Sequence, residues 1–446
     1  MKRIAIIFAL ALSASAASGQ ALLTLDDAVA RALEFNFGLQ VAAVNAQIAD
    51  NTANPGQAGL LPTVTLSAGA NYSRNNATAT LINPDQSPGA PSSIEREING
   101  IQTYGANTSL GVSYTVFDGL GSVNNYRLLQ SNANLSSNQV RILVQTTLAQ
   151  VMNVYYQIGR QQKALKIREE ALARSRARLA FVQNQNAFAA VNRLAVLNAE
   201  VDLNTDSVNL AAAQLAFGNT RRDLNYLLGQ PTETEFTVAE ELAFVQMGTL
   251  DDLTSAVLTE NPELEASRLN QDIAELNLKI ARAGRMPRLA VNASYGFNYA
   301  NNGPISFAQE ITSNGLTGGA TLSVPIFNGF RGQTAVENAE FGVQNARNQR
   351  LDRELALQRD VAKAYAVYQN NLSLIRLNQR SLEAAQLNFD RTREAFELGQ
   401  ATSVQFREAQ LNLLTVENRL NDLRFDVKLQ EVELMRISGR LVDMQD

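Results

Sequence analysis

The chain contains two copies of one sequence pattern. Thr24-Leu25-Asp26-Asp27 recurs as Thr249-Leu250-Asp251-Asp252, a spacing of 225 residues, and Phe117-Asp118-Gly119 recurs as Phe327-Asn328-Gly329, a spacing of 210 residues. The difference (225 − 210 = 15) is an insertion in the first copy, in a stretch rich in Ser, Asn, Pro and Gly. A duplicated unit folds into two similar halves, so each element predicted in one copy is also predicted in the other.

The first 20 residues have the layout of a secretory signal peptide. Lys2 and Arg3 precede an apolar stretch from Ile4 to Leu12, and small residues follow. The sequence therefore predicts an exported protein. No other window approaches the ~18 consecutive apolar residues of a membrane-spanning helix.

The composition argues against several classes of function. The chain has no Cys and no His, so it lacks the best thiol nucleophile, the commonest general base and the commonest metal ligand. Its net charge is −5, and basic residues are spread along the chain rather than clustered. We therefore expect no enzyme, no catalytic residues, no metal or cofactor site, and no nucleic-acid partner.

Each copy is predicted to contain two β-strands of roughly ten to twelve residues. Apolar and small polar residues alternate strictly from residue 63 to 72 and from 288 to 299, and partner strands follow at 106–116 and 319–326. The apolar faces include these side chains: Val64, Leu66, Val112, Tyr114, Val291, Tyr295, Phe297 and Leu322.

This alternation allows two interpretations. Two hairpins could cover a soluble core with their apolar faces, or the strands could cross a membrane with apolar side chains toward lipid, since membrane strands are ~9–11 residues long. A barrel closed by a single chain needs at least about 8 strands. Four strands cannot close, so the membrane interpretation requires several chains to share one barrel.

The remainder of each copy is predicted to form very long helices. From Val123 to Asn186 there is no proline and one glycine, Gly159. In the second copy, apolar residues at steps of three and four run on both sides of Gly399, which is typical of an antiparallel helical hairpin. The hairpin tips fall at 188–192 and 399–403.

The combined pattern resembles the TolC family of outer-membrane efflux proteins. The resemblance rests on the signal peptide, the double copy, the junctions between helix, proline and strand, the FDG and FNG turns, and the tip LGQATSVQFREAQLNLL. It implies an α+β membrane protein, in which four strands from each of three protomers close a 12-stranded β-barrel and long helices continue it as a periplasmic α-helical barrel. The eight apolar strand residues named above would then face lipid.

The predicted organisation has nine segments. They are a signal peptide (1–20), a first-copy helix (21–62), a first β-hairpin (63–117) with a long external loop (73–104), a first helical hairpin (118–229), an inter-repeat segment (230–248), a second-copy helix (249–287), a second β-hairpin (288–328), a second helical hairpin (329–439) and a C-terminal tail (440–446).

The resemblance also suggests residues at the helical tips. Where the family often has Gly-Thr-Arg followed by acidic residues, this chain has Gly399, Gln400 and Ala401, then Gln405 and Glu408. Gln405 and Glu408 are therefore candidates for the periplasmic constriction, although a glutamate on an exposed helix face is the alternative for Glu408. The predicted adaptor-contact tips are Phe188, Ala189, Ala190, Gly399, Gln400 and Ala401.

The family resemblance implies a passive exit duct of a tripartite efflux pump or a type I secretion system. Its partners would be two further copies of the chain, outer-membrane lipid, a periplasmic adaptor protein and an inner-membrane transporter, with drugs, metals, dyes or polypeptides as cargo. The alternative is an elongated periplasmic coiled-coil scaffold whose hairpins cap its helices. In both cases the helices would lie in the periplasm.

Overall fold

The computed structural model describes residues 21–82, 84, 87–88, 91–239, 242–302 and 308–441. The predicted signal peptide and residues 442–446 of the predicted C-terminal tail lie outside this range. The chain divides into two compact units, Met1–Val44 with Asn138–Glu265 and Asp352–Asp446, and Asn45–Ser137 with Ala266–Leu351. Among the described residues, no helix is long and apolar enough to cross a membrane.

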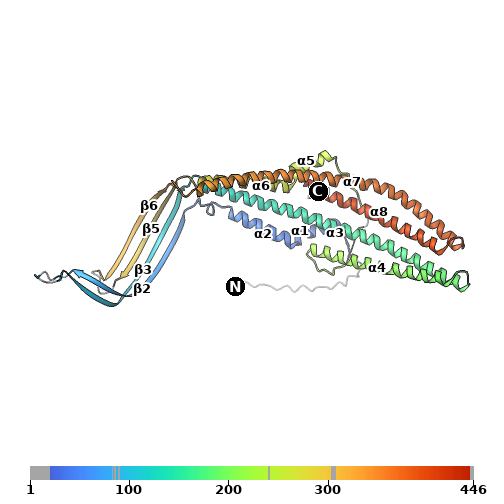
Figure 1. Ribbon diagram of the computed structural model, residues 1–446, viewed down its shortest axis with the longest axis horizontal. Coiled ribbons are helices and arrows are strands. Elements are labelled where there is room, and N and C mark those ends of the chain that lie inside the picture. Colours follow the sequence, from blue (N-terminus) through green and yellow to red (C-terminus); the bar gives the residue numbers. More distant parts are fainter. Residues whose placement is uncertain are drawn as a thin grey trace, which may run out of the picture. The chain divides into compact units, whose positions relative to one another are not determined.

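The first unit contains most of two long helical hairpins, whose longer helices begin in the second unit (Figure 1). Helices α3 (Gly121–Ala187) and α7 (Arg331–Glu397) each have 67 residues, and each turns back into a shorter helix, α4 (Arg193–Leu227) or α8 (Ser403–Ser438). At 1.5 Å per residue, the longer helices extend about 100 Å. The remaining helices are α1 (Leu25–Phe35), α2 (Phe37–Thr52), α5 (Leu250–Glu260) and α6 (Pro262–Ala283).

Each copy begins with two helices where one was predicted, and an asparagine marks the break. The Asn36 side chain donates to the Leu227 carbonyl at 3.1 Å, and Asn261 donates to the Ile437 carbonyl at 2.7 Å. The Asn261 side chain also accepts from the backbone N–H of Leu264, so it ends one helix and starts the next. The two asparagines thus join the start of each copy to the end of its second long helix.

A short parallel sheet lies within the first unit. Strand β1 (Ala21–Leu23) pairs with β4 (Phe236–Val238) of the inter-repeat segment. The Tyr155 hydroxyl donates to the Leu23 carbonyl at 3.0 Å, and the buried Lys428 donates to the carbonyl of Ala243 at 2.7 Å. The first bond holds β1 against α3, and the second holds the inter-repeat segment against α8.

The second unit contains a four-stranded antiparallel sheet in the order β2-β3-β5-β6. Its strands are β2 (Thr63–Ile82), β3 (Ser93–Phe117), β5 (Arg288–Asn301) and β6 (Glu310–Ser323). Directly paired residues share a face, and the register places all eight predicted lipid-facing residues on the same one. Leu66, Leu316 and Leu322 on this face are 75%, 76% and 65% exposed.

The opposite face of the sheet carries mainly small uncharged side chains along residues 63–73, 105–115, 288–300 and 311–323, with Arg288, which pairs with Ser323, as the one charged residue of these stretches. A typical row across it is Thr63, Ser113, Asn292 and Gly319. The sheet is therefore amphipathic, and its apolar face is exposed in the single protomer.

The stretch predicted as a loop at 73–104 is largely strand. β2 and β3 continue to pair as far as Ile82 and Ser93, with a bulge between Asn75 and Ala77. Gly100 has φ +74°, and its N–H donates to the Asn76 side chain at 2.8 Å. Thr78, Thr80 and Ile82 are β-branched residues two positions apart, which suits a strand. The Asn- and Pro-rich composition around them predicted a loop instead.

Candidate functional site

The candidate site lies where the two helical hairpins turn. The first turn connects α3 to α4 through residues 188–192, and Ala189 in it has φ +58°. The Asn186 side chain donates to the Val191 carbonyl at 2.8 Å, and the Asn192 side chain accepts from the Ala195 N–H at 3.1 Å. Two asparagines therefore fix this tip.

The second turn connects α7 to α8 and uses a capping box. Gly399 has φ +71°, a conformation that suits glycine, and the Thr402 side chain caps the first turn of α8. The Gln405 side chain accepts from the Thr402 N–H at 2.8 Å. The structure thus gives Gln405 a capping role, whereas the sequence suggested it for the constriction.

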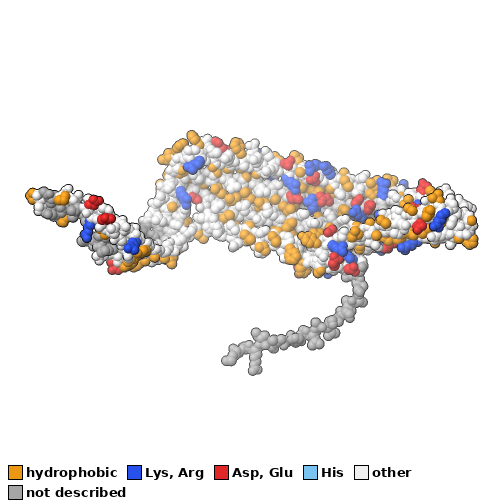
Figure 2. Space-filling view, turned by 60° about the horizontal axis from the view of Figure 1, so that its bottom comes forward, with side chains coloured by type: hydrophobic (Ala, Val, Ile, Leu, Met, Phe, Trp, Pro, Cys, Tyr) orange, Lys and Arg blue, Asp and Glu red, His pale blue; other side chains and the backbone are white. Residues whose placement is uncertain are grey.

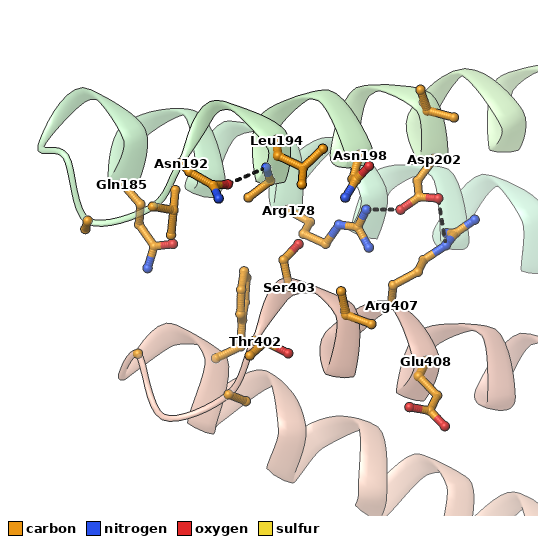
Figure 3. Close-up of a pocket in the computed structure, with 18 of the residues that line it drawn as sticks. Arg178, Gln185, Asn192, Leu194, Asn198, Asp202, Thr402, Ser403, Arg407 and Glu408 are labelled. Carbon is orange, nitrogen blue, oxygen red and sulfur yellow. Dashed lines mark hydrogen bonds and ion pairs between the residues drawn. The ribbon is translucent and has the colours of Figure 1, made fainter.

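A groove of about 1150 Å³ runs between the tips. In Figure 3, α3 and α4 form one wall and α8 the other. Its rim carries exposed aliphatic side chains, with Leu194 at 61%, Val201 at 63% and Val404 at 69% exposure. The groove therefore combines apolar edges with the polar floor described next.

The floor of the groove is a network of buried charges that joins three helices. Arg178 of α3 pairs with Asp202 of α4, and Arg407 of α8 holds both oxygens of Asp206 at 2.7 and 2.9 Å. The two side chains of the Arg407–Asp206 pair are 12% and 7% exposed. Arg407 also lies 3.7 Å from Asp202, so the two arginines and two aspartates form one neutral cluster.

Two uncharged side chains complete the network. Ser175 donates to Asp206 at 2.6 Å, and Gln410 donates to Ser175 at 2.8 Å and to the Ala171 carbonyl at 2.9 Å. Ser175 and Gln410 are fully buried. The second hairpin is therefore bonded to both helices of the first hairpin through side chains that are fully or mostly buried.

The network changes how its charged groups titrate. Burial alone would raise the pKa of Asp206, but hydrogen bonds from Arg407 and Ser175 outweigh it and hold this pKa below its usual value. Burial would lower the pKa of Arg407, yet Asp206 raises it. Both groups are therefore charged at neutral pH, and the Arg407–Asp206 ion pair is fully formed there.

A second charged pair lies further along α3 and α8 and behaves differently. Burial raises the pKa of Glu417, and Arg174, 3.9 Å away, offsets this only in part. Arg174 also lies over the ring of Phe389, 5.2 Å from its centre. An apolar cluster of all four helices packs beside these groups, and it includes Val182, Val196, Phe389, Phe396, Phe406 and Leu413.

Glu408 stands apart from the charged network. It is exposed, and Figure 3 shows it pointing away from Arg407 and Asp202. It lines both the main groove and a smaller one between α7 and α8. On the face shown in Figure 2, acidic and basic side chains lie intermixed over the helices rather than in a patch of one sign.

The structure places the predicted tip residues in the two turns, because α3 ends at Ala187 and α7 ends at Glu397. Sequence reasoning missed Arg178, Asp202, Asp206 and Arg407. The one local signal was a pair of acids four residues apart on α4, which share a helix face. Among the described residues, no group of three or more acidic side chains could hold a metal ion.

Comparison with known proteins gives a consistent result. Residues 28–230 and 253–440 match the family model described as outer membrane efflux protein. The outer membrane protein TolC of Vibrio cholerae is 26% identical over 41% of this chain and 42% of its own length, and the cation efflux system protein CusC of Escherichia coli is 24% identical over 74% of this chain and 72% of its own.

A solved structure has the same fold over nearly the whole chain. The CmeC outer membrane channel of Campylobacter jejuni superposes with a TM-score of 0.80 at 15% identity, covering 99% of this chain and 94% of that one. The predicted family resemblance and fold class are confirmed by these matches.

Proposed function

Because the chain belongs to the outer membrane efflux protein family and resides in the outer membrane, we propose that three copies assemble into an exit duct for a tripartite efflux pump or a type I secretion system. The observation that carries the proposal is the four-stranded sheet with one exposed apolar face and one small polar face. Four strands are too few to close a barrel, and three copies supply enough.

In this assembly the two faces of the sheet meet different solvents. Val64, Leu66, Val291 and the other predicted lipid-facing residues contact the hydrocarbon, and the Ser, Thr, Asn and Gly face lines the lumen. Apart from Arg288 at the start of β5, the side chains on this face are mainly small and uncharged, so they offer cargo little selective contact. Selection then belongs to the inner-membrane transporter and its periplasmic adaptor.

The helical tips are the proposed adaptor contacts. Both interrupt long helices at equivalent places in the two copies, and both present exposed side chains, with Phe188 at 85% and Leu398 at 72% exposure. Cysteine at Ala189 or Ala401 should crosslink to a periplasmic adaptor in whole cells. Crosslinks obtained only from cysteines between residues 74 and 103 would reverse the proposed orientation.

Glu408 is the proposed acidic ring of the periplasmic end. Three copies near one axis would repel one another and attract cations, and the exposure of Glu408 leaves it available for this role. Asn198 is its counterpart in the first copy and lines the same groove. Glu408→Gln should lower the cation selectivity of the purified channel in planar bilayers, with Asn198→Asp as the matched variant that should raise it.

The test of the duct itself is conductance. Purified protein should form a heat-sensitive oligomer that conducts ions in a planar bilayer. Recovery of a soluble periplasmic protein without conductance would instead favour the coiled-coil scaffold. Unchanged selectivity in Glu408→Gln, within a conducting channel, would remove only the acidic ring.

A further inference from the structure

The turn from strand to helix carries a large apolar residue in an unusual backbone conformation in each copy. In the first copy, Gly119 and Leu120 have φ +69° and +67°, and in the second, Gly329 and Phe330 have φ +67° and +63°. A bulky side chain is rarely found in this left-handed conformation, because it strains the backbone. Leu120 and Phe330 are nevertheless 58% and 66% exposed, so burial within the protomer does not offset the strain.

The exposure of Leu120 is not caused by a missing neighbouring strand. β3, which ends just before this turn, has a partner strand on both sides within the protomer. The backbone of the turn is packed so closely that a Cβ on Gly119 would lie 2.4 Å from the Cβ of Met286. The turn is therefore held in place by its neighbours, and Leu120 is still exposed beside them.

Both turns follow directly from the proposed lipid-facing side of the sheet. Phe117 pairs with Leu289, which pairs in turn with Leu322 on that side. Phe327, the counterpart of Phe117, is 75% exposed and meets Phe330 edge to face, with 5.4 Å between the ring centroids. The apolar surface of the sheet therefore continues to the end of the turn.

Two arginines lie where this apolar surface ends in the second copy. Arg331 is the first residue of α7, and its Nε donates to the carbonyl of Asn328 at 3.0 Å. The Arg285 side chain lies beside the same helix start, because its Cγ is 3.3 Å from the position that a Cβ on Gly332 would take. Both arginines are exposed, and neither forms an ion pair with an acidic side chain of the described residues.

The surroundings of the two arginines favour an anion. α7 has no acidic residue in its first turn, and the N-terminal end of a helix carries a partial positive charge that adds to theirs. The nearby Arg288 is engaged elsewhere, because it donates to Thr115 on the opposite face of the sheet. The positive charge of Arg285 and Arg331 therefore lies directly beside an exposed aromatic pair.

We propose that this turn binds the phosphate group of an anionic phospholipid in the periplasmic leaflet of the outer membrane. Phe327 and Phe330 insert among the acyl chains, and Arg285 and Arg331 hold the headgroup phosphate. Guanidinium groups pair well with phosphate, and basic residues beside a bilayer attract anionic lipids. The inference rests on the proposed lipid-facing side of the sheet, and it adds a lipid class and the residues that select it.

The first copy has the same turn without the arginines. The repeat spacings, 285 − 225 and 331 − 210, place Leu60 and Gly121 at the counterpart positions. The first turn therefore contributes only the apolar Leu120 to the bilayer. The phosphate contact belongs to the periplasmic end of the β5–β6 hairpin.

Lipid selectivity tests the phosphate contact. Native mass spectrometry of the purified trimer, incubated with phosphatidylglycerol or with phosphatidylcholine, should show tighter binding of phosphatidylglycerol. Arg285→Gln and Arg331→Gln should each lower this preference about 5-fold. Arg282→Gln is the matched control, because Arg282 is already paired with Glu340 at 2.9 Å and its loss should leave the preference unchanged.

Tryptophan fluorescence tests the insertion of the turn, because the chain has no tryptophan of its own. In vesicles of phospholipid with brominated acyl chains, Phe330→Trp should be quenched nearly as strongly as Leu322→Trp on the sheet. Leu398→Trp, at the exposed helical tip, is the control that should keep its fluorescence.

Several results would overturn this lipid site and leave the duct intact. They are equal affinity of the unmodified trimer for the two lipids, an equal loss of preference in Arg282→Gln, and no quenching of Phe330→Trp in a conducting trimer. Displacement of phosphatidylglycerol by millimolar inorganic phosphate would assign the arginines to a free anion instead of a lipid. Absence of any conducting oligomer of the unmodified protein would overturn the proposed function itself.

Discussion

The two copies of the repeat have nearly the same backbone but different chemistry at their contacts. α3 and α7 have equal lengths, and α4 and α8 differ by one residue. In the charged network, however, each participant has an unrelated counterpart at the spacing of 210. Ser175, Arg178, Asp202 and Asp206 correspond to Ala385, Asn388, Asn412 and Val416, and Arg407 and Gln410 correspond to Leu197 and Glu200.

The residues that set the backbone are the ones that both copies preserve. The capping threonines Thr24 and Thr249, the junction asparagines Asn36 and Asn261, and the glycines after α4 and α8 set the backbone, and both copies keep them. The side chains that decide which helix packs on which have diverged. Identical copies would present the same side chains at every helix contact. The Arg407–Asp206 pair has no equivalent at the counterpart positions, so it is specific to the contact between α8 and α4 inside the protomer.

The strongest test of this divergence is removal of Asp206. Asp206→Ala leaves the mostly buried Arg407 without its closest partner, with only Asp202 at 3.7 Å, which should cost about 3 kcal/mol or more. Amide hydrogen exchange near residues 200–208 and 405–412 should accelerate by about 10²-fold or more. Val416→Ala, at the counterpart position, should change exchange far less.

The double variant Asp206→Ala with Arg407→Ala distinguishes the pair from its parts. Removing both charges should restore much of the protection, because no uncompensated charge is left buried. Additive losses in the double variant would mean that the two residues stabilise the tips separately.

The sheet should show the opposite behaviour, because its two copies have the same pattern. Leu66→Arg in the first copy and Val291→Arg in the second should each cost about 2–4 kcal/mol near mid-bilayer. Ser67→Arg and Asn292→Arg, one residue further along, should be tolerated in the lumen. Yield of folded oligomer on semi-native gels measures all four, and equal losses on both faces would contradict the face assignment.

Much of the fold could be predicted from periodicity. The alternation at 288–299 predicted β5, and the steps of three and four around Gly399 predicted a helical hairpin that the structure shows in α7 and α8. These elements were predictable because each is determined by residues close in sequence. The break at Asn36 was not recognised, because it depends on a carbonyl 191 residues away.

The candidate site was harder to predict for the same reason. Asp206 and Arg407 are 201 residues apart, and nothing local says that α4 and α8 meet. Gln405 is a different case, because Thr402 three residues before it forms a capping-box pattern that the sequence alone contains. The local pattern predicts the observed capping role of Gln405 without any comparison to the family's acidic residues.

The two tips allow a smaller test of the copies. Thr402 caps α8 and its own N–H donates to the Gln405 side chain, whereas Asn192 caps α4 without such a reciprocal bond. Thr402→Ala and Asn192→Ala should each cost about 1 kcal/mol. Gln405→Ala should leave the α4 cap unchanged. It should weaken the α8 cap, which hydrogen exchange at residues 403–406 would detect.

Glu417 gives the smallest predicted effect and the clearest pH dependence. Its pKa in the folded protein is raised above the usual 4.5, mainly by burial, so ionisation of this group destabilises the fold as pH rises above about that value. Glu417→Gln should therefore raise the free energy of unfolding at pH 7 by up to about 1 kcal/mol, and the melting midpoint with it, and should have no effect below pH 4.5.

Asp206 has the opposite sign: its pKa is lowered from 3.8, so its stabilisation is present above that pH and is lost as pH falls through the folded-state value. Circular dichroism melts from about pH 2 to 7.5 separate the two, with Ser207→Ala, at the counterpart of Glu417, as a variant without pH dependence. A benefit of Glu417→Gln that persisted unchanged at pH 4 would show that packing, and not ionisation, decides the effect.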